Sequence, residues 1–333
     1  MKNKQIVAFI VAAAVFVVTG VSSVAINTWA KKTTASYMSV YDKMLATGET
    51  ETPAEDYVAV VEVEGTIYSE PTTSAWGSTE GYDHPSTMKY IDQLMEDKYN
   101  KAIMLYMNTP GGEVTASDDL YLKLMEYKEK TGRKIYCYYA DQSCSGGYYI
   151  SMAADEIYAN RNCWTGSIGV IVQLTNMQGL YEKLGIQEIN ITSGANKAMG
   201  SAGENLTEEQ RAILQSLVDE AYEQFVSIIS ESREMDINTV KKLADGRIYT
   251  AKQALSLDLI DGISTQDEYF DKIRQELGSD ITIYQRSGKD TFGLANLFAS
   301  LQSLRSRSDA EVVGDMLEKD KMGGVMYYAD GLQ

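Results

Sequence analysis

Apolar and polar residues alternate in blocks along this chain, and the blocks predict strands and helices in turn. Short runs rich in β-branched and apolar residues predict strands at 58–67, 102–107, 134–139, 156–159, 167–172 and 188–192. Apolar residues at helical spacing follow several of these runs; one set is Met88, Ile91, Leu94 and Met95, after a cap at Ser86 or Thr87. This alternation favours an α/β body over residues 57–285.

A longer helix is predicted near the end of that body. Thr207-Glu-Glu-Gln210 has the form of a capping box. The apolar residues that follow at helical spacing are expected to face inward: Leu214, Leu217, Ala221, Phe225 and Ile228. Residues 286–333 differ in character, with a helical pattern over 292–304, a polar stretch and an apolar end. They are expected to form a C-terminal extension.

The N-terminal segment predicts membrane insertion. Residues 6–26 carry no charge and follow Lys2 and Lys4, and about 20 apolar residues span a bilayer. Residues 1–27 are therefore expected to form a cytoplasmic leader and transmembrane anchor, and residues 28–56 a polar stalk. A cleavable signal peptide is the alternative, with Ser23-Val24-Ala25 as a small-residue cleavage site.

Composition narrows the possible partners and chemistry. The 30 basic and 47 acidic residues give a net charge of −17, which argues against a nucleic-acid partner. Cys137, Cys144 and Cys163 lie in apolar contexts without metal-type spacing, so buried free thiols are expected. No phosphate-binding loop or metal-ligand cluster is present in the sequence, and no cofactor is expected.

Ser145 is the candidate nucleophile. It precedes Gly146 and Gly147 at the predicted passage from a strand into a helix. A second turn, Asn108-Thr-Pro-Gly-Gly112, carries glycines whose backbone N–H groups can face a cleft. One of these N–H groups, together with that of Gly146, would form an oxyanion hole. Taken alone, both turns are equally compatible with a purely structural role.

A serine hydroxyl needs an adjacent base, and this chain has one histidine, His84. His84 lies in a predicted surface loop between Asp83 and Pro85. Lys197 is the other candidate, in the small and nearly uncharged segment 192–202. Loss of solvation lowers the pKa of a lysine, so that it can accept a proton. The residues alone leave both candidates open.

Several blocks in order resemble the signal peptide peptidase A family of serine proteases, in its single-domain Gram-positive form. They are Asn108–Gly112, Ser145–Ala159, Thr165–Ile171, the Ser-Gly-Ala-Asn-Lys segment that ends at Lys197, and Gly246–Gly262. The resemblance covers about residues 57–275. It implies an α/β, ClpP/crotonase-like fold of repeated strand–strand–helix units, preceded by one transmembrane helix.

The resemblance also implies roles for individual residues. Ser145 would be the nucleophile and Lys197 the general base of a Ser-Lys dyad. Ser167 would orient the lysine, and Gly146 with Gly111 would form the oxyanion hole, with Gly112 as the alternative to Gly111. Cys144 is expected to point away from Ser145 and to serve packing.

The function implied is that of a membrane-anchored endopeptidase that degrades remnant signal peptides and other flexible peptides. The family further implies a homo-oligomeric ring, a single-pass location in the cell membrane and an extracytoplasmic catalytic domain. From its own residues, the apolar, strand-like end at Met326–Ala329, which follows a polar spacer, is expected to add as a strand to the substrate groove or else to form a frayed tail. Two other functions stay open: a crotonase-like acyl-CoA enzyme and a non-catalytic, membrane-tethered scaffold.

Overall fold

The computed structural model describes residues 52–71 and 81–286, and the backbone of residues 326–328. Among them, eight strands form one sheet in the order β7-β6-β4-β2-β1-β9, and β5 and β8 continue it beside β4. All neighbouring strands are parallel except β6 and β7. The strands are β1 (Tyr57–Glu64), β2 (Asn100–Thr109), β4 (Lys134–Cys144), β5 (Glu156–Ala159), β6 (Trp164–Gly166), β7 (Ile248–Thr250), β8 (Gly262–Ile263) and β9 (Thr282–Gln285).

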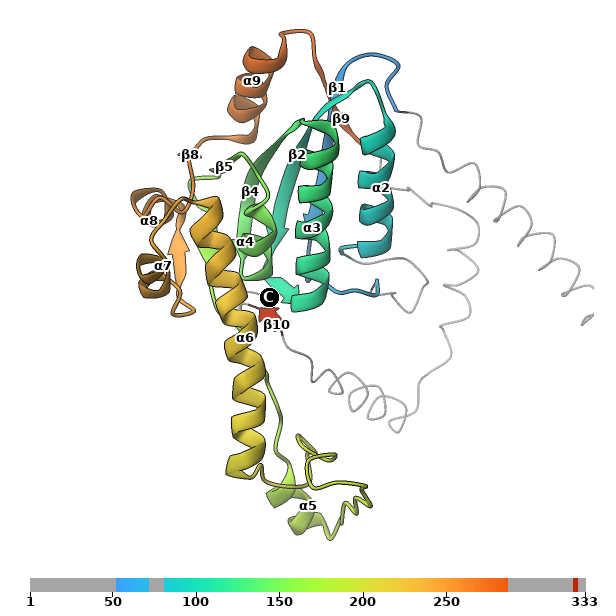
Figure 1. Ribbon diagram of the computed structural model, residues 1–333, viewed down its shortest axis with the longest axis vertical. Coiled ribbons are helices and arrows are strands. Elements are labelled where there is room, and N and C mark those ends of the chain that lie inside the picture. Colours follow the sequence, from blue (N-terminus) through green and yellow to red (C-terminus); the bar gives the residue numbers. More distant parts are fainter. Residues whose placement is uncertain (1–51, 72–80, 287–325, 329–333) are drawn as a thin grey trace, which may run out of the picture. The chain divides into compact units, whose positions relative to one another are not determined.

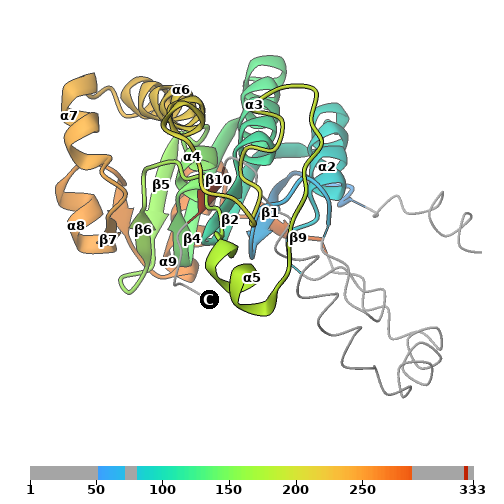
Figure 2. The same cartoon turned by 90° about the horizontal axis from the view of Figure 1, so that it is seen from below.

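Helices cover both faces of the sheet (Figures 1 and 2). One face packs against α2 (His84–Glu96), α3 (Val114–Thr131), α4 (Gly146–Ser151) and the C-terminal half of α6 (Glu208–Ser232). The other face packs against α9 (Gln266–Leu277). Two short helices flank β7: α7 (Ile237–Leu243) and α8 (Ala251–Ser256). A sheet buried on both faces requires nearly continuous apolar strands, which is the pattern seen in β1 and β2.

The α/β architecture and four of the predicted strands are confirmed, with changed bounds for three of them. β2 and β4 extend beyond the predicted 102–107 and 134–139, β1 is shorter than 58–67, and β5 matches 156–159. The capping box is also present: the N–H of Gln210 donates to Thr207 Oγ1, and the N–H of Thr207 donates to Gln210 Oε1, both at 3.1 Å.

Two predicted strands are wrong. The strand expected at 167–172 lies earlier, at β6, because Gly166 and Ser167 have positive φ angles of 86° and 49° that end the extended backbone. Residues 188–192 form no strand and are exposed. Among the described residues, no sheet edge lies beside Ile189 and Ile191 to complete a ladder, so the strand preference of these β-branched residues is not realised.

The predicted inward face of the long helix holds only in part. Phe225, Val226 and Ile229 are buried, whereas Leu217 is exposed. The N-terminal half of α6 runs past the sheet, beside a segment that we call the arm, residues 172–206, which includes α5 (Gln178–Leu184) (Figure 1). The arm lies beside this half of the helix, where Gln210 Nε2 donates to the Ala195 carbonyl at 3.3 Å.

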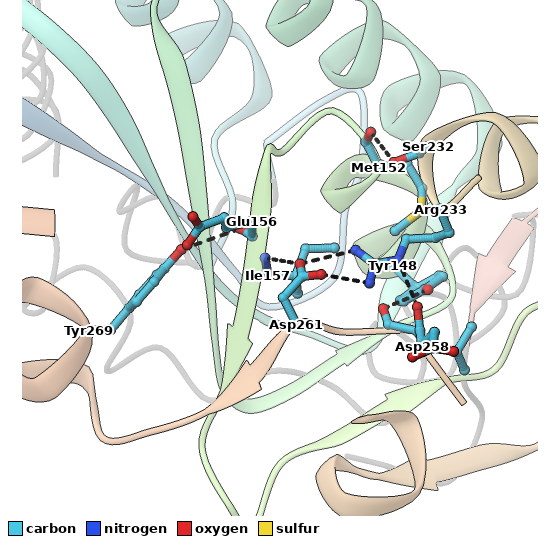
Figure 3. Close-up of polar contacts among 10 residues, drawn as sticks. Tyr148, Met152, Glu156, Ile157, Ser232, Arg233, Asp258, Asp261 and Tyr269 are labelled. Carbon is cyan, nitrogen blue, oxygen red and sulfur yellow. Dashed lines mark hydrogen bonds and ion pairs between the residues drawn. The ribbon is translucent and has the colours of Figure 1, made fainter. Parts of the chain in front are cut away.

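A polar network ties α4 and α6 to β5 and to the segment that holds Leu259 and Asp261 (Figure 3). The guanidinium of Arg233, at the end of α6, donates twice to the Asp261 carboxylate, at 2.9 and 3.1 Å. The same carboxylate accepts from the N–H of Ile157 in β5 at 2.7 Å. The Tyr148 hydroxyl in α4 donates to the Leu259 carbonyl at 2.8 Å. The short helix α4 is therefore anchored by groups outside its own six residues.

The predicted anchor at 6–26, the stalk up to residue 51 and the helix at 292–304 lie outside the described residues. In the part of the chain that the structure covers, no helix combines the length and the apolar character needed to cross a membrane. The sheet begins at Tyr57 and ends at Gln285 along the chain.

Candidate active site

Ser145 lies in a strained turn between β4 and α4. Its φ and ψ are 54° and −114°, a conformation that non-glycine residues rarely adopt. Its N–H donates to the Gly166 carbonyl at 2.7 Å, and its carbonyl accepts from the N–H of Tyr149 at 2.9 Å. The side chain is 1% exposed, and Oγ has no hydrogen-bond partner among the described residues. Such strain, held by surrounding bonds, is common at catalytic residues.

The glycine loop forms β3 (Gly111–Glu113), which reaches the same end of the sheet. A segment at Ile67 lies along one edge of β3: the N–H of Ile67 donates to the Gly111 carbonyl at 2.9 Å, and the N–H of Glu113 donates to the Ile67 carbonyl at 2.8 Å. The Gly111 carbonyl and the Gly112 N–H belong to one trans peptide, so they point in opposite directions. The Gly112 N–H therefore points to the other edge of β3.

The two candidate glycines differ in what their N–H groups contact. The Gly111 N–H donates to Thr109 Oγ1 at 3.1 Å. The geometry therefore favours the Gly112 N–H as the oxyanion donor of this loop. Residue 112 must be glycine, because a Cβ there would lie 2.0 Å from the Ile67 carbonyl oxygen.

Pairing of β4 with β6 brings Ser167 beside Ser145. Cys144 and Gly166 are partners in the parallel register, and each serine is the residue immediately after its strand. Ser167 is nearly buried, and its N–H donates to the Arg247 carbonyl at 2.7 Å. A cavity of about 320 Å³ opens beside it, lined by Ser167, Gly169, Val170, Ile171, Tyr222, Ala244, Asp245 and Gly246.

Lys197 is not brought to Ser145 within this chain. It lies on the arm with its side chain exposed, next to the N-terminal half of α6 rather than the end of the sheet. The arm carries several exposed apolar residues: Leu180, Leu184, Ile186, Ile189 and Ile191. The desolvated surroundings expected for Lys197 are thus not supplied by the described residues of one copy.

His84 is not the predicted loop histidine on the surface. It is the first residue of α2 and is 7% exposed, and the Tyr82 hydroxyl oxygen lies 2.8 Å from its Nδ1. Its Nε2 lies 4.0 Å from a carboxylate oxygen of Asp119. Burial lowers the pKa of His84, against the opposite effect of Asp119. These contacts with Tyr82 and Asp119 indicate that His84 has a structural role at the start of α2.

The cysteines behave as predicted. Cys137, Cys144 and Cys163 are free and buried. Cys144 Sγ lies 3.6 Å from the Trp164 carbonyl, and burial raises the pKa of this thiol to about 12. The neutral thiol of Cys144 beside Ser145 therefore serves packing.

The tail meets the glycine loop. β10 (Met326–Tyr328) pairs antiparallel with β3, and its register places Met326 opposite Glu113, Tyr327 opposite Gly112 and Tyr328 opposite Gly111. The Ile67 segment takes one edge of β3, so β10 lies on the edge to which the Gly112 N–H points.

Sequence reasoning missed Thr109. The signal was available in Asn108-Thr-Pro-Gly-Gly112, since a threonine hydroxyl often accepts a hydrogen bond from the N–H two residues later. Sequence reasoning also had no means to place Lys197, because that placement depends on where the arm leaves the sheet.

Comparisons with known proteins identify the family of this chain. Residues 127–280 match the model of Peptidase family S49. The chain is 35% identical over 263 residues to the "Putative signal peptide peptidase SppA" of Enterococcus faecium, covering 77% of this chain and 76% of that protein. It is 29% identical to "Protease 4" of Haemophilus influenzae, over 66% of this chain and 34% of that protein. It is 28% identical to "Serine protease SPPA, chloroplastic" of Arabidopsis thaliana, over 73% and 36%.

Among solved structures, a ClpP1 mutant from Listeria monocytogenes aligns with 62% of this chain and 92% of its own, at a TM-score of 0.41 and 15% identity. The sequence matches to Protease 4 and to the chloroplastic SPPA each cover only about a third of those longer proteins. The match to Peptidase family S49 covers residues 127–280, and the Enterococcus relative is matched over most of its length. This chain therefore belongs to the SppA group of Peptidase family S49 and is a serine peptidase.

Proposed function

We propose that this protein is a membrane-anchored endopeptidase with Ser145 as nucleophile and Lys197 as general base. The observation that carries the proposal is the meeting of three segments at the carboxyl ends of β2, β4 and β6. The strained Ser145, the Ser167 turn and the Gly112 N–H converge there. Ligands bind at this end of parallel sheets in many α/β proteins.

The chemistry would proceed through an acyl-enzyme. Neutral Lys197 takes the proton of Ser145 Oγ as this oxygen attacks the peptide carbonyl. The N–H groups of Gly112 and Gly146 stabilise the resulting oxyanion, and the lysine passes its proton to the leaving amine. Water then attacks the ester, with the lysine again as base, and releases the carboxylic acid and Ser145.

Lys197 would come from a second copy of the chain. Its own arm holds it away from Ser145, and the arm's exposed apolar residues favour contact with another protein surface. A neighbouring arm that entered the cavity beside Ser167 would place an ammonium next to both serines. This contact would also exclude water from the ammonium, the condition under which lysine acts as a base. Repetition of such a head-to-tail contact closes a ring.

The substrate would be a flexible peptide that adds as a strand to β3. The edge of β3 that β10 occupies offers backbone groups to an extended chain, and β10 itself makes this type of pairing. The names of the relatives support remnant signal peptides as substrates. The uncharged run at 6–26 supports a single-pass anchor in the cell membrane with the catalytic domain outside the cytoplasm.

The tail at β10 would compete with substrate, because both would pair with the same edge of β3. Deletion of residues 323–333 is expected to increase hydrolysis of short peptides. Unchanged activity and an unchanged pH profile after this deletion would contradict a blocking role.

The test is hydrolysis of a fluorogenic peptide by wild type, Ser145→Ala, Lys197→Ala and a reassembled equal mixture of the two variants. Each variant alone should be inactive. The mixture should recover activity at about a quarter of the interfaces, those that pair an intact serine with an intact lysine. No recovery in a mixture shown to exchange subunits would argue against a shared site. Activity in Lys197→Ala would require another base.

A further inference from the structure

Thr109 occupies a position that touches both segments expected to stabilise the oxyanion. It is the last residue of β2 and is fully buried. Its register partner in β4 is Ser143, two residues before Ser145. The proposed chemistry assigns no role to this side chain.

The hydroxyl of Thr109 completes the anchoring of Gly111. Its Oγ1 accepts from the Gly111 N–H at 3.1 Å, while the Gly111 carbonyl accepts from the N–H of Ile67 at 2.9 Å. Gly111 has a φ of 105°, where the backbone of glycine has wide freedom. These two bonds fix that freedom, and with it the plane of the peptide that carries the Gly112 N–H.

The methyl group of Thr109 contacts the second segment. A Cβ at Gly147 would lie 2.6 Å from Thr109 Cγ2, so α4 packs directly on this methyl group. The neighbouring residue in α4, Gly146, carries the other proposed oxyanion donor. One side chain therefore spans the glycine loop through its hydroxyl and the nucleophile helix through its methyl group.

We infer that Thr109 is a positioning residue: its hydroxyl holds Gly111 so that the Gly112 N–H points at the developing oxyanion. The inference rests on the proposed function of Ser145. The orientation of a hydrogen-bond donor matters most in the transition state, when negative charge develops on the substrate oxygen. Loss of the hydroxyl should therefore lower kcat and leave the binding of ground-state peptides almost unchanged.

Two pairs of variants isolate the hydroxyl. Thr109→Val replaces it with a methyl group of similar shape, and Thr109→Ala differs from Thr109→Ser only by the oxygen. Loss of a whole oxyanion donor costs about 10²- to 10³-fold in kcat, so misdirection of one should cost about 10- to 100-fold. Thr109→Val should show this loss against wild type, and Thr109→Ala should show a similar loss against Thr109→Ser. Thr109→Ser should retain kcat within about threefold.

A second readout separates positioning from a merely structural role. A peptide boronate forms a tetrahedral adduct with a reactive serine, and its affinity should fall by the same factor as kcat/KM. The affinity of the same peptide without the boronate group, which forms no adduct with the serine, should change by no more than about twofold. Equal losses in Thr109→Ser and Thr109→Val, or unchanged kcat in both hydroxyl deletions, would overturn the inference. If Thr109→Val does not fold, the serine and alanine pair decides.

Ser143→Ala is the matched control. Its hydroxyl is also fully buried, lies in the same layer and has no hydrogen-bond partner within the described residues. Removal of the Ser143 hydroxyl should leave kcat and boronate affinity unchanged.

Labelling with a fluorophosphonate separates the hypothesis that Ser145 is the nucleophile from the hypothesis that Thr109 positions the oxyanion donor. Loss of labelling in Ser145→Ala supports the nucleophile. Wild-type protein whose label resides elsewhere would contradict the proposed function before Thr109 is tested.

Discussion

The surroundings of Ser145 and those of Lys197 are opposites, although both residues are needed for one proposed reaction. Ser145 is buried at the end of a sheet whose two faces are covered, in a turn held by bonds to Gly166 and Tyr149. Lys197 lies on an exposed arm, where Ile189 and Ile191 are 77% and 96% exposed. One chain thus builds the proposed nucleophile and its proposed oxyanion donors but leaves the proposed base on its surface.

The contrast separates the parts of the proposed site that depend on folding from those that depend on association. The geometry around Ser145 is set by strand register and by contacts that a Cβ at Gly112 or Gly147 would disrupt. The geometry around Lys197 would be set only where the arm meets another copy. Activity should therefore respond to changes in the body through folding and local geometry, and to changes in the arm through assembly.

Lys197→Ala should have the largest effect on activity. Loss of a general base costs about 10²- to 10⁴-fold in kcat. The free energy of unfolding should stay the same, because the side chain is exposed. Peptide hydrolysis and thermal unfolding measure the two quantities. The control is Lys183→Ala, an exposed lysine on the same arm. Equal activity of the two variants would remove Lys197 from the site.

Gly112→Ala should cause the second-largest loss of activity. It tests the glycine loop of the body as Lys197→Ala tests the arm. A Cβ would meet the Ile67 carbonyl oxygen at 2.0 Å, so β3 must move and turn its N–H. We expect a loss of about 10²-fold or more in kcat, the size found when an oxyanion donor is removed. Gly179→Ala on the arm is the control, since a Cβ there meets nothing within 4 Å. Full activity of Gly112→Ala would exclude this N–H as a donor.

A double variant, Ile189→Ser with Ile191→Ser, tests whether the arm makes the proposed contact between subunits. Surface substitutions change unfolding free energy by about 0.5 kcal/mol or less, so the subunit should remain as stable. Sedimentation should show less assembled protein, with activity lost in proportion. Leu122→Ser on α3 provides a control, as an exposed leucine of the body. An assembly that survives the double variant would place the subunit contact elsewhere.

The smallest effect should come from His84 and appear as a pH dependence of stability. Burial lowers its pKa from the ordinary 6.5. Between the lowered value and 6.5 the unfolded chain binds a proton that the folded chain does not, so stability falls as pH drops below 6.5. Urea unfolding across this range measures the slope. His84→Gln should flatten it, and an unchanged slope would assign the dependence to other groups. Peptide hydrolysis by this variant should persist at neutral pH.

Predictions of secondary structure from the sequence were most accurate where local residue preferences agree with the tertiary packing. The buried strand β2 and the capping box at Thr207 follow from short patterns, and the structure contains both. The prediction failed at 167–172, because the apolar pattern did not reveal the positive φ of Ser167. It failed again at Ile189 and Ile191, where β-branched residues lie on an exposed arm without a sheet beside them.

By itself, the sequence determined the alternation of strands and helices, the serine at a tight strand-to-helix turn, the glycine loop and the three buried thiols. These depend on periodicity and on residues close together in the chain. Only the tertiary structure decided that Gly112 rather than Gly111 has its N–H toward the β10 edge of β3, and that Lys197 lies apart from Ser145. The orientation of a peptide and the place of an arm depend on contacts between distant segments such as Ile67, β3 and α6. Local residue preferences do not encode such contacts, because each arises only when the whole sheet has assembled.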